Sequence, residues 1–164
     1  DPREDVVLAE DQDVLAVDQD LPILPVDVVI ARDEREGRGP LQGLSAGLKA
    51  LPDGVEAAYI TSCDVPLLVP GFVTQMLALA DGYDIALIEI DGFAHPLSAV
   101  YRRSVLPQVE ELLAKDRLRP AFLFDLVRTR RVAPAEMTAD PQLRTLRNLN
   151  TRDDYEQALA LAGF

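Results

Sequence analysis

The sequence is poor in the residues that build cross-linked or thiolate sites, with one cysteine, Cys63, and one histidine, His95. A single cysteine excludes an internal disulfide framework and a metal site made of several thiolates, and it favours a reducing, cytoplasmic setting. No apolar run reaches the roughly 18 residues of a membrane-spanning helix. The opening residues, DPRED, do not resemble a secretion signal. We therefore expect a cytoplasmic protein with no membrane partner.

Positive charge is also scarce, since 16 lysine and arginine residues face 28 aspartate and glutamate residues, a formal net charge of −12. Nucleic acid is excluded as the main partner, because its binding needs many basic side chains on the phosphate backbone. An acidic balance suits divalent cations, although a solvated acidic surface explains most of these side chains equally well. The 164 residues, 48% of them apolar, fit one ordinary globular domain.

Apolar runs alternate with helical patterns along the chain, which indicates an α/β layer fold with a mostly parallel sheet. The short gap between the runs at 84–90 and 96–101 predicts one antiparallel excursion. A last helix is predicted between Thr151, its cap, and Gly163, with Tyr155, Leu159 and Leu161 turned inward. The other predicted strands are 14–17, 26–30, 57–61 and 129–133, and the other predicted helices are 41–51, 70–79, 104–114 and 120–126.

Ligands of open α/β sheets bind beyond the carboxyl ends of the strands, so Asp64, just after the strand at 57–61, is the first candidate. It lies in the segment CDVP, where a proline stiffens the turn. A carboxylate in that place suits Mg²⁺, which prefers oxygen ligands and often combines one or two carboxylates with substrate phosphates. The alternative is that Asp64 only caps the turn by accepting backbone N–H bonds.

Two further candidates lie at the ends of predicted elements. Gly39 and Pro40 open the helix at 41–51, where a ligand can approach the backbone and the helix terminus favours anions. An ordinary turn is the alternative. His95, at the start of a strand, could hydrogen-bond a phosphate oxygen or act as acid or base, or it could serve as a structural hydrogen-bonding residue. No nucleophile adjoins it, which disfavours a Ser-His-Asp hydrolase.

Amide and guanidinium groups supply the remaining candidates. Asn148 and Asn150 alternate along an extended segment, which places both side chains on one face, where they could bind a polar ligand or hold a second loop. Arg119, with Arg117 before it, could meet phosphate through its planar fork, or it could lie in solvent at a helix entrance.

Four segments, taken in order, resemble the molybdenum cofactor guanylyltransferases. They are GPLQGLSAGL at 39–48, TSCDVPLL at 61–68, HPLSAVYR at 95–102 and RNLNTRDDY at 147–155. The resemblance runs from about Val26 to the end of the chain. It implies a Rossmann-like three-layer α/β sandwich of the nucleotide-diphospho-sugar transferase type. It also implies transfer of GMP from GTP to the terminal phosphate of molybdopterin, with release of pyrophosphate and with Mg²⁺ as cofactor.

The resemblance also assigns roles to residues. Asp64 matches the catalytic, metal-binding aspartate, which also contacts the nucleotide. The nucleotide side includes Asp33, Gly39 and Pro40, and the pterin side includes His95, Arg119, Asn148 and Asn150. GTP and molybdopterin are the implied partners, with molybdoenzymes or other cofactor-biosynthesis proteins as further candidates.

The chain departs from the family pattern at its beginning. The family opens with a strand and a loop of the form LAGGxSxRMGxxK, and residues 1–40 contain no match to it. We therefore expect residues 1–164 to be a single, N-terminally truncated nucleotidyltransferase domain that lacks its first strand and phosphate-binding loop. Such a stretch should bind nucleotide poorly by itself, and the neighbours of the missing strand should be left unpaired.

Two other functions remain open from the sequence. The first is a molybdopterin cytidylyltransferase or a related nucleotidyltransferase, because the CDxP segment is shared with cytidylyltransferase relatives. The second is a non-catalytic, degenerate homologue that binds pterin or serves as an adaptor. Selectivity between GTP and CTP separates the first from the guanylyl reading, and a lack of nucleotide binding would favour the second.

Overall fold

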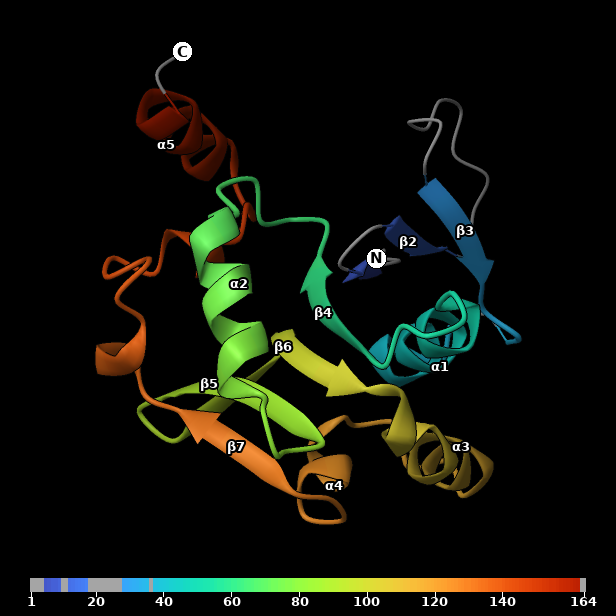
Figure 1. The fold of residues 1–164 in the computed structure, drawn as a ribbon. Coiled ribbons are helices and arrows are strands. Elements are labelled where there is room, and N and C mark those ends of the chain that lie inside the picture. The colour runs from blue at the N-terminus through green and yellow to red at the C-terminus, as the bar shows by residue number, and fades with distance from the viewer. Residues whose placement is uncertain (1–4, 10–11, 18–27, 36, 163–164) are drawn as a thin grey trace.

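The computed structural model describes residues 5–9, 12–17, 28–35 and 37–162 of the chain. The described strands form one seven-stranded sheet in the order β3-β2-β1-β4-β6-β5-β7, with helices on both faces (Figure 1). These strands are β1 (Asp5–Ala9), β2 (Gln12–Val17), β3 (Val28–Arg32), β4 (Ala57–Ser62), β5 (Ile85–Ile90), β6 (Phe93–Arg102) and β7 (Thr129–Val132). The predicted α/β class is confirmed.

Helices α1 and α3 cover one face of the sheet and α2 covers the other, so the expected three-layer sandwich is also confirmed (Figure 1). The described helices are α1 (Pro40–Ala50), α2 (Pro70–Leu79), α3 (Leu106–Ala114), α4 (Ala121–Phe124) and α5 (Arg152–Ala162), with short 3₁₀ helices η1 (Arg103–Val105), η2 (Pro134–Glu136) and η3 (Arg144–Leu146). No described helix is long and apolar enough to cross a membrane.

The central strands are apolar throughout because both of their faces are covered. In β4, Ala58 and Ile60 pack toward α1 and α3, while Tyr59 packs toward α2. Alternate side chains of a strand point to opposite faces, so this one run contributes to both cores. Tyr59 meets Phe72 of α2 edge-to-face, with ring centroids 6.1 Å apart.

The sheet was predicted to be mostly parallel with one antiparallel excursion, but of its six described pairings only β2 with β3 and β5 with β7 are parallel, and the other four are antiparallel. The predicted antiparallel pair is β5 with β6. A second reversed strand, β1, was not predicted, since acidic residues interrupt the first 20 positions and hide the strand period. Because β4 pairs with β1 on one side and β6 on the other, the expectation of unpaired neighbours was wrong for β4. The predicted strand at 26–30 begins outside the described residues, which show it from Val28.

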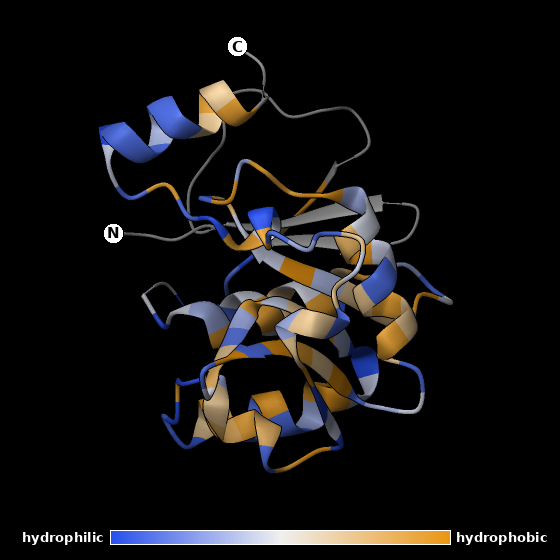
Figure 2. Ribbon diagram, turned by 90° about the vertical axis from the view of Figure 1, so that its left-hand side faces the viewer, coloured by the Kyte–Doolittle hydropathy of each residue, from blue (hydrophilic) through white to orange (hydrophobic). Residues whose placement is uncertain are grey.

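The last helix is capped as predicted but packs differently. Thr151 Oγ1 accepts a hydrogen bond from Asp154 N at 3.1 Å, and Asp154 Oδ2 accepts one from Thr151 N at 2.8 Å. However, Tyr155 and Leu161 are 53% and 44% exposed, so the inward placement predicted for them was wrong. Helix α5 stands at the margin of the molecule (Figure 2), and Ala158 is its one buried side chain among residues 152–161.

Candidate active site at the carboxyl edge of the sheet

The ends of β3 and β4 bring the first two candidate carboxylates to one edge of the sheet. The pairing registers across β1 and β2 place Thr61 of β4 level with Ile30 of β3. Asp33 and Asp64 each follow three residues later, so they lie at the same edge. Three strand spacings separate β3 from β4, or roughly 14 Å at the usual spacing between strands. This distance leaves room for an extended ligand between the two carboxylates.

Asp64 is half-buried in the turn after β4, and both of its carboxylate oxygens are held. Ser62 Oγ donates a short hydrogen bond to Oδ1, and Asn148 Nδ2 donates to Oδ2 at 3.1 Å. The backbone N–H of Leu149 also donates to the carbonyl of Asp64 at 2.8 Å. Each carboxylate oxygen retains acceptor capacity, because an ionised carboxylate offers about four lone-pair sites. The group is therefore oriented and still able to bind a cation.

The surroundings of Asp64 fit magnesium better than zinc. The described residues contain no group of three or more His, Cys, Asp or Glu side chains that could hold a metal. Zinc sites need three or four such ligands. Magnesium keeps several waters and often uses one or two carboxylates together with substrate phosphates. A single oriented carboxylate at a strand end is compatible with that mode of binding.

The loop before α1 depends on the backbone of Gly39. Its φ of 71° and ψ of −168° form a conformation that is almost exclusive to glycine. A Cβ built at Gly39 would meet nothing within 4 Å, so the conformation rather than the available space demands glycine. The Gly39 carbonyl accepts the N–H of Gln42 at 3.0 Å, and Pro40 is the first residue of α1. The chain thus turns sharply into a helix whose first turn faces the carboxyl edge.

Arg38 fastens this loop to α3, a role that the sequence analysis missed. Its Nη2 donates to the carbonyl of Leu113 at 2.7 Å and pairs with Asp116 at 2.8 Å. The Arg38 side chain is only 15% exposed, so its guanidinium is largely shielded from solvent. An arginine placed between Gly37 and Gly39 was the available signal, since it joins a flexible turn to a long, multiply donating side chain.

His95 lies in a bulge of β6 at the same edge. The register on β5 shifts between Leu87 and Glu89, so residues 95–98 stand opposite Ile88 alone. Bulges of this kind often lie next to active sites, where they re-aim a side chain. Because Ser98 pairs with Thr61 of β4, His95 lies three residues beyond that level, as Asp64 does on the neighbouring strand.

Partial burial lowers the pKa of His95 from its ordinary value of 6.5, so the imidazole is neutral at pH 7. As the pH falls below about 6.5, His95 is therefore protonated in the unfolded chain before it is protonated in the folded protein. We expect stability to decline from there down to the lower, folded pKa, and His95→Asn to remove this part of the decline. Urea unfolding of both proteins between pH 5 and 7.5 measures it, and parallel curves would contradict the burial of His95.

Of the remaining predicted residues, one contacts Asp64 and two do not. Asn148 contacts Asp64 directly, as described above. The backbone N–H of Asn150 donates to Asp154 Oδ2 at 3.1 Å, while its side chain is exposed. Arg119 is exposed in the segment between α3 and α4, and in the described part of the chain no hydrogen bond or ion pair joins its side chain to Asp64. The structure therefore unites Asp64 with Asn148 and leaves Arg119 apart from that pair.

Ser62 is a second residue that the sequence analysis missed. It ends β4, and its side chain reaches the carboxylate two positions later. The signal was present in the segment TSCD, because a serine hydroxyl two residues before an aspartate can close such a local hydrogen bond. The buried position of Ser62, 6% exposed, keeps that bond away from solvent.

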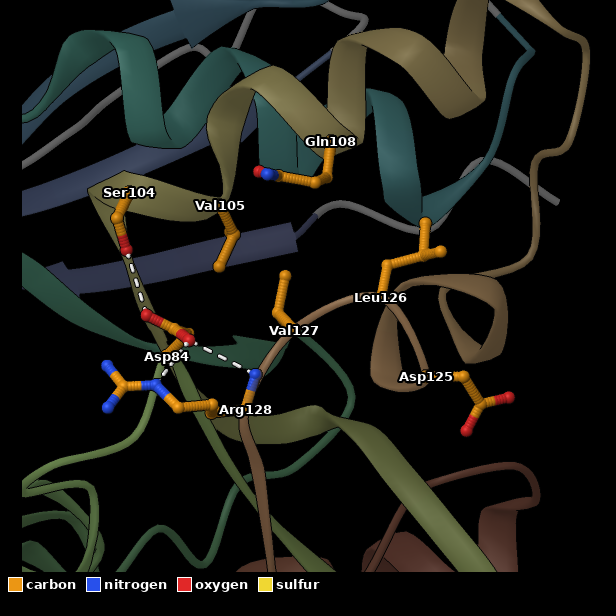
Figure 3. Close-up of a pocket in the computed structure, with 8 residues that line it drawn as sticks. All are labelled: Asp84, Ser104, Val105, Gln108, Asp125, Leu126, Val127 and Arg128. Carbon is orange, nitrogen blue, oxygen red and sulfur yellow. Dashed lines mark hydrogen bonds and ion pairs between the residues drawn. The ribbon is translucent and has the colours of Figure 1, made fainter.

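A pocket of about 360 Å³ lies at the opposite edge of the sheet, before β5 and β7 (Figure 3). Asp84 accepts hydrogen bonds there from Arg128 N at 3.1 Å, Arg128 Nε at 3.3 Å and Ser104 Oγ at 3.3 Å. Burial alone would raise the pKa of Asp84, but these bonds and the Arg128 charge outweigh it and lower the pKa. Asp84 thus joins the starts of two strands, which is a structural role.

Comparison with known proteins identifies the family of the chain. The family model described as the MobA-like NTP transferase domain matches residues 4–131. The chain belongs to the MobA-like NTP transferase family. It is therefore a transferase enzyme of the nucleotidyltransferase class, and the resemblance stated from the sequence is confirmed.

Curated relatives extend the match beyond the family model. The transferase is 31% identical over 152 residues to the molybdenum cofactor guanylyltransferase of Desulfosudis oleivorans, a match that covers 92% of this chain and 74% of the relative. It is 32% identical over 166 residues to a relative from Methanosarcina acetivorans named a probable molybdenum cofactor guanylyltransferase, covering 94% of this chain and 72% of that protein. The family role in molybdenum cofactor biosynthesis is supported by both.

Solved structures agree on the fold. The molybdopterin-guanine dinucleotide biosynthesis protein A of Archaeoglobus fulgidus superposes with a TM-score of 0.70 at 19% identity, covering 82% of this chain and 68% of the other. A protein from Aquifex aeolicus gives the same TM-score, 0.70, at 22% identity, with 85% and 71% covered. These similarities support the Rossmann-like nucleotidyltransferase fold.

Proposed function

We propose that the transferase moves GMP from GTP to the terminal phosphate of molybdopterin, releasing pyrophosphate and forming the molybdopterin guanine dinucleotide. The names of its relatives support this choice of substrates. The structural observation that carries it is the contact of Asp64 with Asn148, because it joins the proposed metal-binding carboxylate to the segment assigned to the pterin side. Transfer from a nucleotide to the phosphate of a second substrate requires that the residues binding the two substrates lie next to each other.

The proposed reaction is an in-line displacement at the α-phosphorus of GTP. An oxygen of the acceptor phosphate forms the new bond to that phosphorus while the bond to the oxygen bridging the α- and β-phosphorus breaks, and pyrophosphate leaves with the electron pair. Phosphoryl-type transfers of this kind depend mainly on positioning and electrostatic stabilisation. The chain supplies positioning through Ser62 and Asn148, which hold the Asp64 carboxylate from both of its oxygens.

Mg²⁺ is the cofactor that this site would take. Asp64 would hold it, and when bound it would neutralise charge on the phosphates. On the nucleotide side, the proposed contacts are Asp33, Gly39 and Pro40, which lie at the end of β3 and at the start of α1. The amino end of α1 favours the approach of an anionic group.

On the acceptor side, we propose His95, Arg119, Asn148 and Asn150 as contacts for molybdopterin. The neutral imidazole of His95 can donate one hydrogen bond and accept another, so it suits an acceptor without adding charge. The exposed amide of Asn150 lies two residues from the amide that Asp64 engages, at the amino end of α5. Arg119 would have to reach the acceptor from the segment between α3 and α4.

Isothermal titration of GTP, and then of CTP, tests the nucleotide choice. The gene should be expressed from its native start codon, and the titrations should be made with Mg²⁺ present. We expect GTP to bind more tightly than CTP by about ten-fold or more, since each hydrogen bond that discriminates one base from another contributes about 1 kcal/mol or more. Tighter binding of CTP would support a cytidylyltransferase, and no binding of either would support the pterin-binding or adaptor reading.

A further inference from the structure

A buried polar pair lies behind the segment that carries Asn148. Asp140 is 3% exposed and Thr145 is fully buried. The two Asp140 carboxylate oxygens accept hydrogen bonds from the backbone N–H groups of Arg144, at 3.0 Å, and Thr145, at 2.9 Å. A buried carboxylate is costly unless hydrogen bonds of this kind compensate for its lost hydration. The turn that contains η3 is therefore held from within by Asp140.

This turn is fastened to the loop that follows Asp64. Thr145 Oγ1 accepts a hydrogen bond from the backbone N–H of Val69 at 3.1 Å, just before α2 begins. The other end of the same loop is joined to the Asn148 segment by the Leu149 N–H, which donates to the Asp64 carbonyl at 2.8 Å. The loop at 64–69 and the segment at 140–149 are thus linked at two points.

The backbone of the turn is strained in a way that these bonds maintain. Leu143, the residue before η3, has φ 49° and ψ 42°, a left-handed conformation that is unfavourable for a bulky side chain. Such conformations persist where the surrounding contacts enforce them, and they cluster at functional sites. Its N–H donates to the Asp140 carbonyl at 2.9 Å, so Asp140 holds the strained residue as well.

We propose that Thr145, supported by Asp140, is a positioning residue that holds the Asn148 amide against the Asp64 carboxylate. The inference rests on the proposed function in one respect, namely that Asp64 is the carboxylate on which turnover depends. The alternative is that Asp140 and Thr145 serve only to stabilise η3. The bonds to Asp140 would suffice for that, and the bond from Val69 to Thr145 would not be needed. The bond to Val69 ties the turn to the Asp64 loop.

Thr145→Val and Thr145→Ser form a matched pair, because valine keeps the shape of threonine without the hydroxyl and serine keeps the hydroxyl. In the protein read from its native start codon, we expect Thr145→Val to lower kcat about ten-fold, the usual effect of removing a group that orients a ligand residue. Exchange of the Leu149 amide hydrogen should become about ten-fold faster, since one hydrogen bond contributes about 1 kcal/mol. Thr145→Ser should restore most of both quantities.

A double mutant shows whether Thr145 acts through Asn148. If it does, Thr145→Val combined with Asn148→Ala should turn over no more slowly than Asn148→Ala alone. Losses that multiply would overturn the proposal, as would an unchanged Leu149 exchange rate in Thr145→Val. Leu112→Ala, a buried change in α3, controls for general instability and should not accelerate Leu149 selectively. If the wild-type protein shows no turnover of GTP, the proposed function fails, and the exchange rates alone decide the role of Thr145.

Discussion

Asp64→Ala is expected to lower the turnover of GTP by more than about 100-fold while the protein stays folded. Removing a residue that merely orients a metal ligand usually costs 10- to 100-fold, so removing the ligand itself should cost more. The free energy of unfolding should fall by about 1–3 kcal/mol, because Ser62 and Asn148 lose the charged acceptor of their hydrogen bonds. Single-turnover rates with Mg²⁺ present, together with a urea unfolding curve, measure the two effects separately.

Asp84→Ala is the matched control, since Asp84 is also a hydrogen-bonded carboxylate beside a strand but lies at the opposite edge of the sheet. It should lower the free energy of unfolding by about 1–3 kcal/mol, the usual effect of removing a charged acceptor from its donors, and leave turnover in place. Wild-type turnover in Asp64→Ala, or an equal loss of turnover in both variants, would contradict the assignment of the site.

Gly39→Ala should have the largest effect after Asp64→Ala, and it should act on the binding of the nucleotide. The backbone at Gly39 would be strained by about 1–3 kcal/mol with any side chain. The loop would therefore shift at the start of α1, the proposed nucleotide side. We expect the KM for GTP to rise about ten-fold or more, in proportion to that strain. Initial rates over a range of GTP concentrations measure it.

Gly54→Ala is the control that distinguishes a direct effect on the KM for GTP from a loss of stability. Gly54 also has a positive φ, 86°, and a Cβ there would likewise meet nothing within 4 Å. It lies in the turn between α1 and β4, at the opposite edge of the sheet from Gly39. Both variants should lose similar stability, and only Gly39→Ala should lose affinity for GTP. A similar rise in KM for both would mean that general destabilisation explains the effect.

The central elements of the fold are predictable because local pattern and tertiary environment agree there. The run at 57–61 is apolar at nearly every position, and β4 is found at Ala57–Ser62 with both faces buried. The helix predicted at 41–51 is found at Pro40–Ala50, since proline at the first position suits a helix start. Strand β1 was missed because its five residues lie among acidic positions that give no clear period.

The site was predictable only in part, for a different physical reason. Asp64 and Gly39 could be singled out because each has a local cause, a strand end and a glycine turn. The contacts that hold them join distant parts of the chain, such as Asn148 to Asp64 and Arg38, next to Gly39, to Leu113. Spacing along the sequence does not determine such pairs, which arise when the sheet and its flanking segments pack. Arg38 likewise shows its role only with Leu113 and Asp116 in place, whereas Ser62 bonds to a residue two positions away and could have been predicted from the segment TSCD.

The most direct test of the account is to follow the α-phosphate of labelled GTP in a reaction with molybdopterin and Mg²⁺, using the protein read from its native start codon. The account predicts that the label appears in a pterin dinucleotide together with an equal amount of pyrophosphate, and that Asp64→Ala forms neither. Intact GTP after prolonged incubation, or pyrophosphate release without a labelled pterin product, would contradict it.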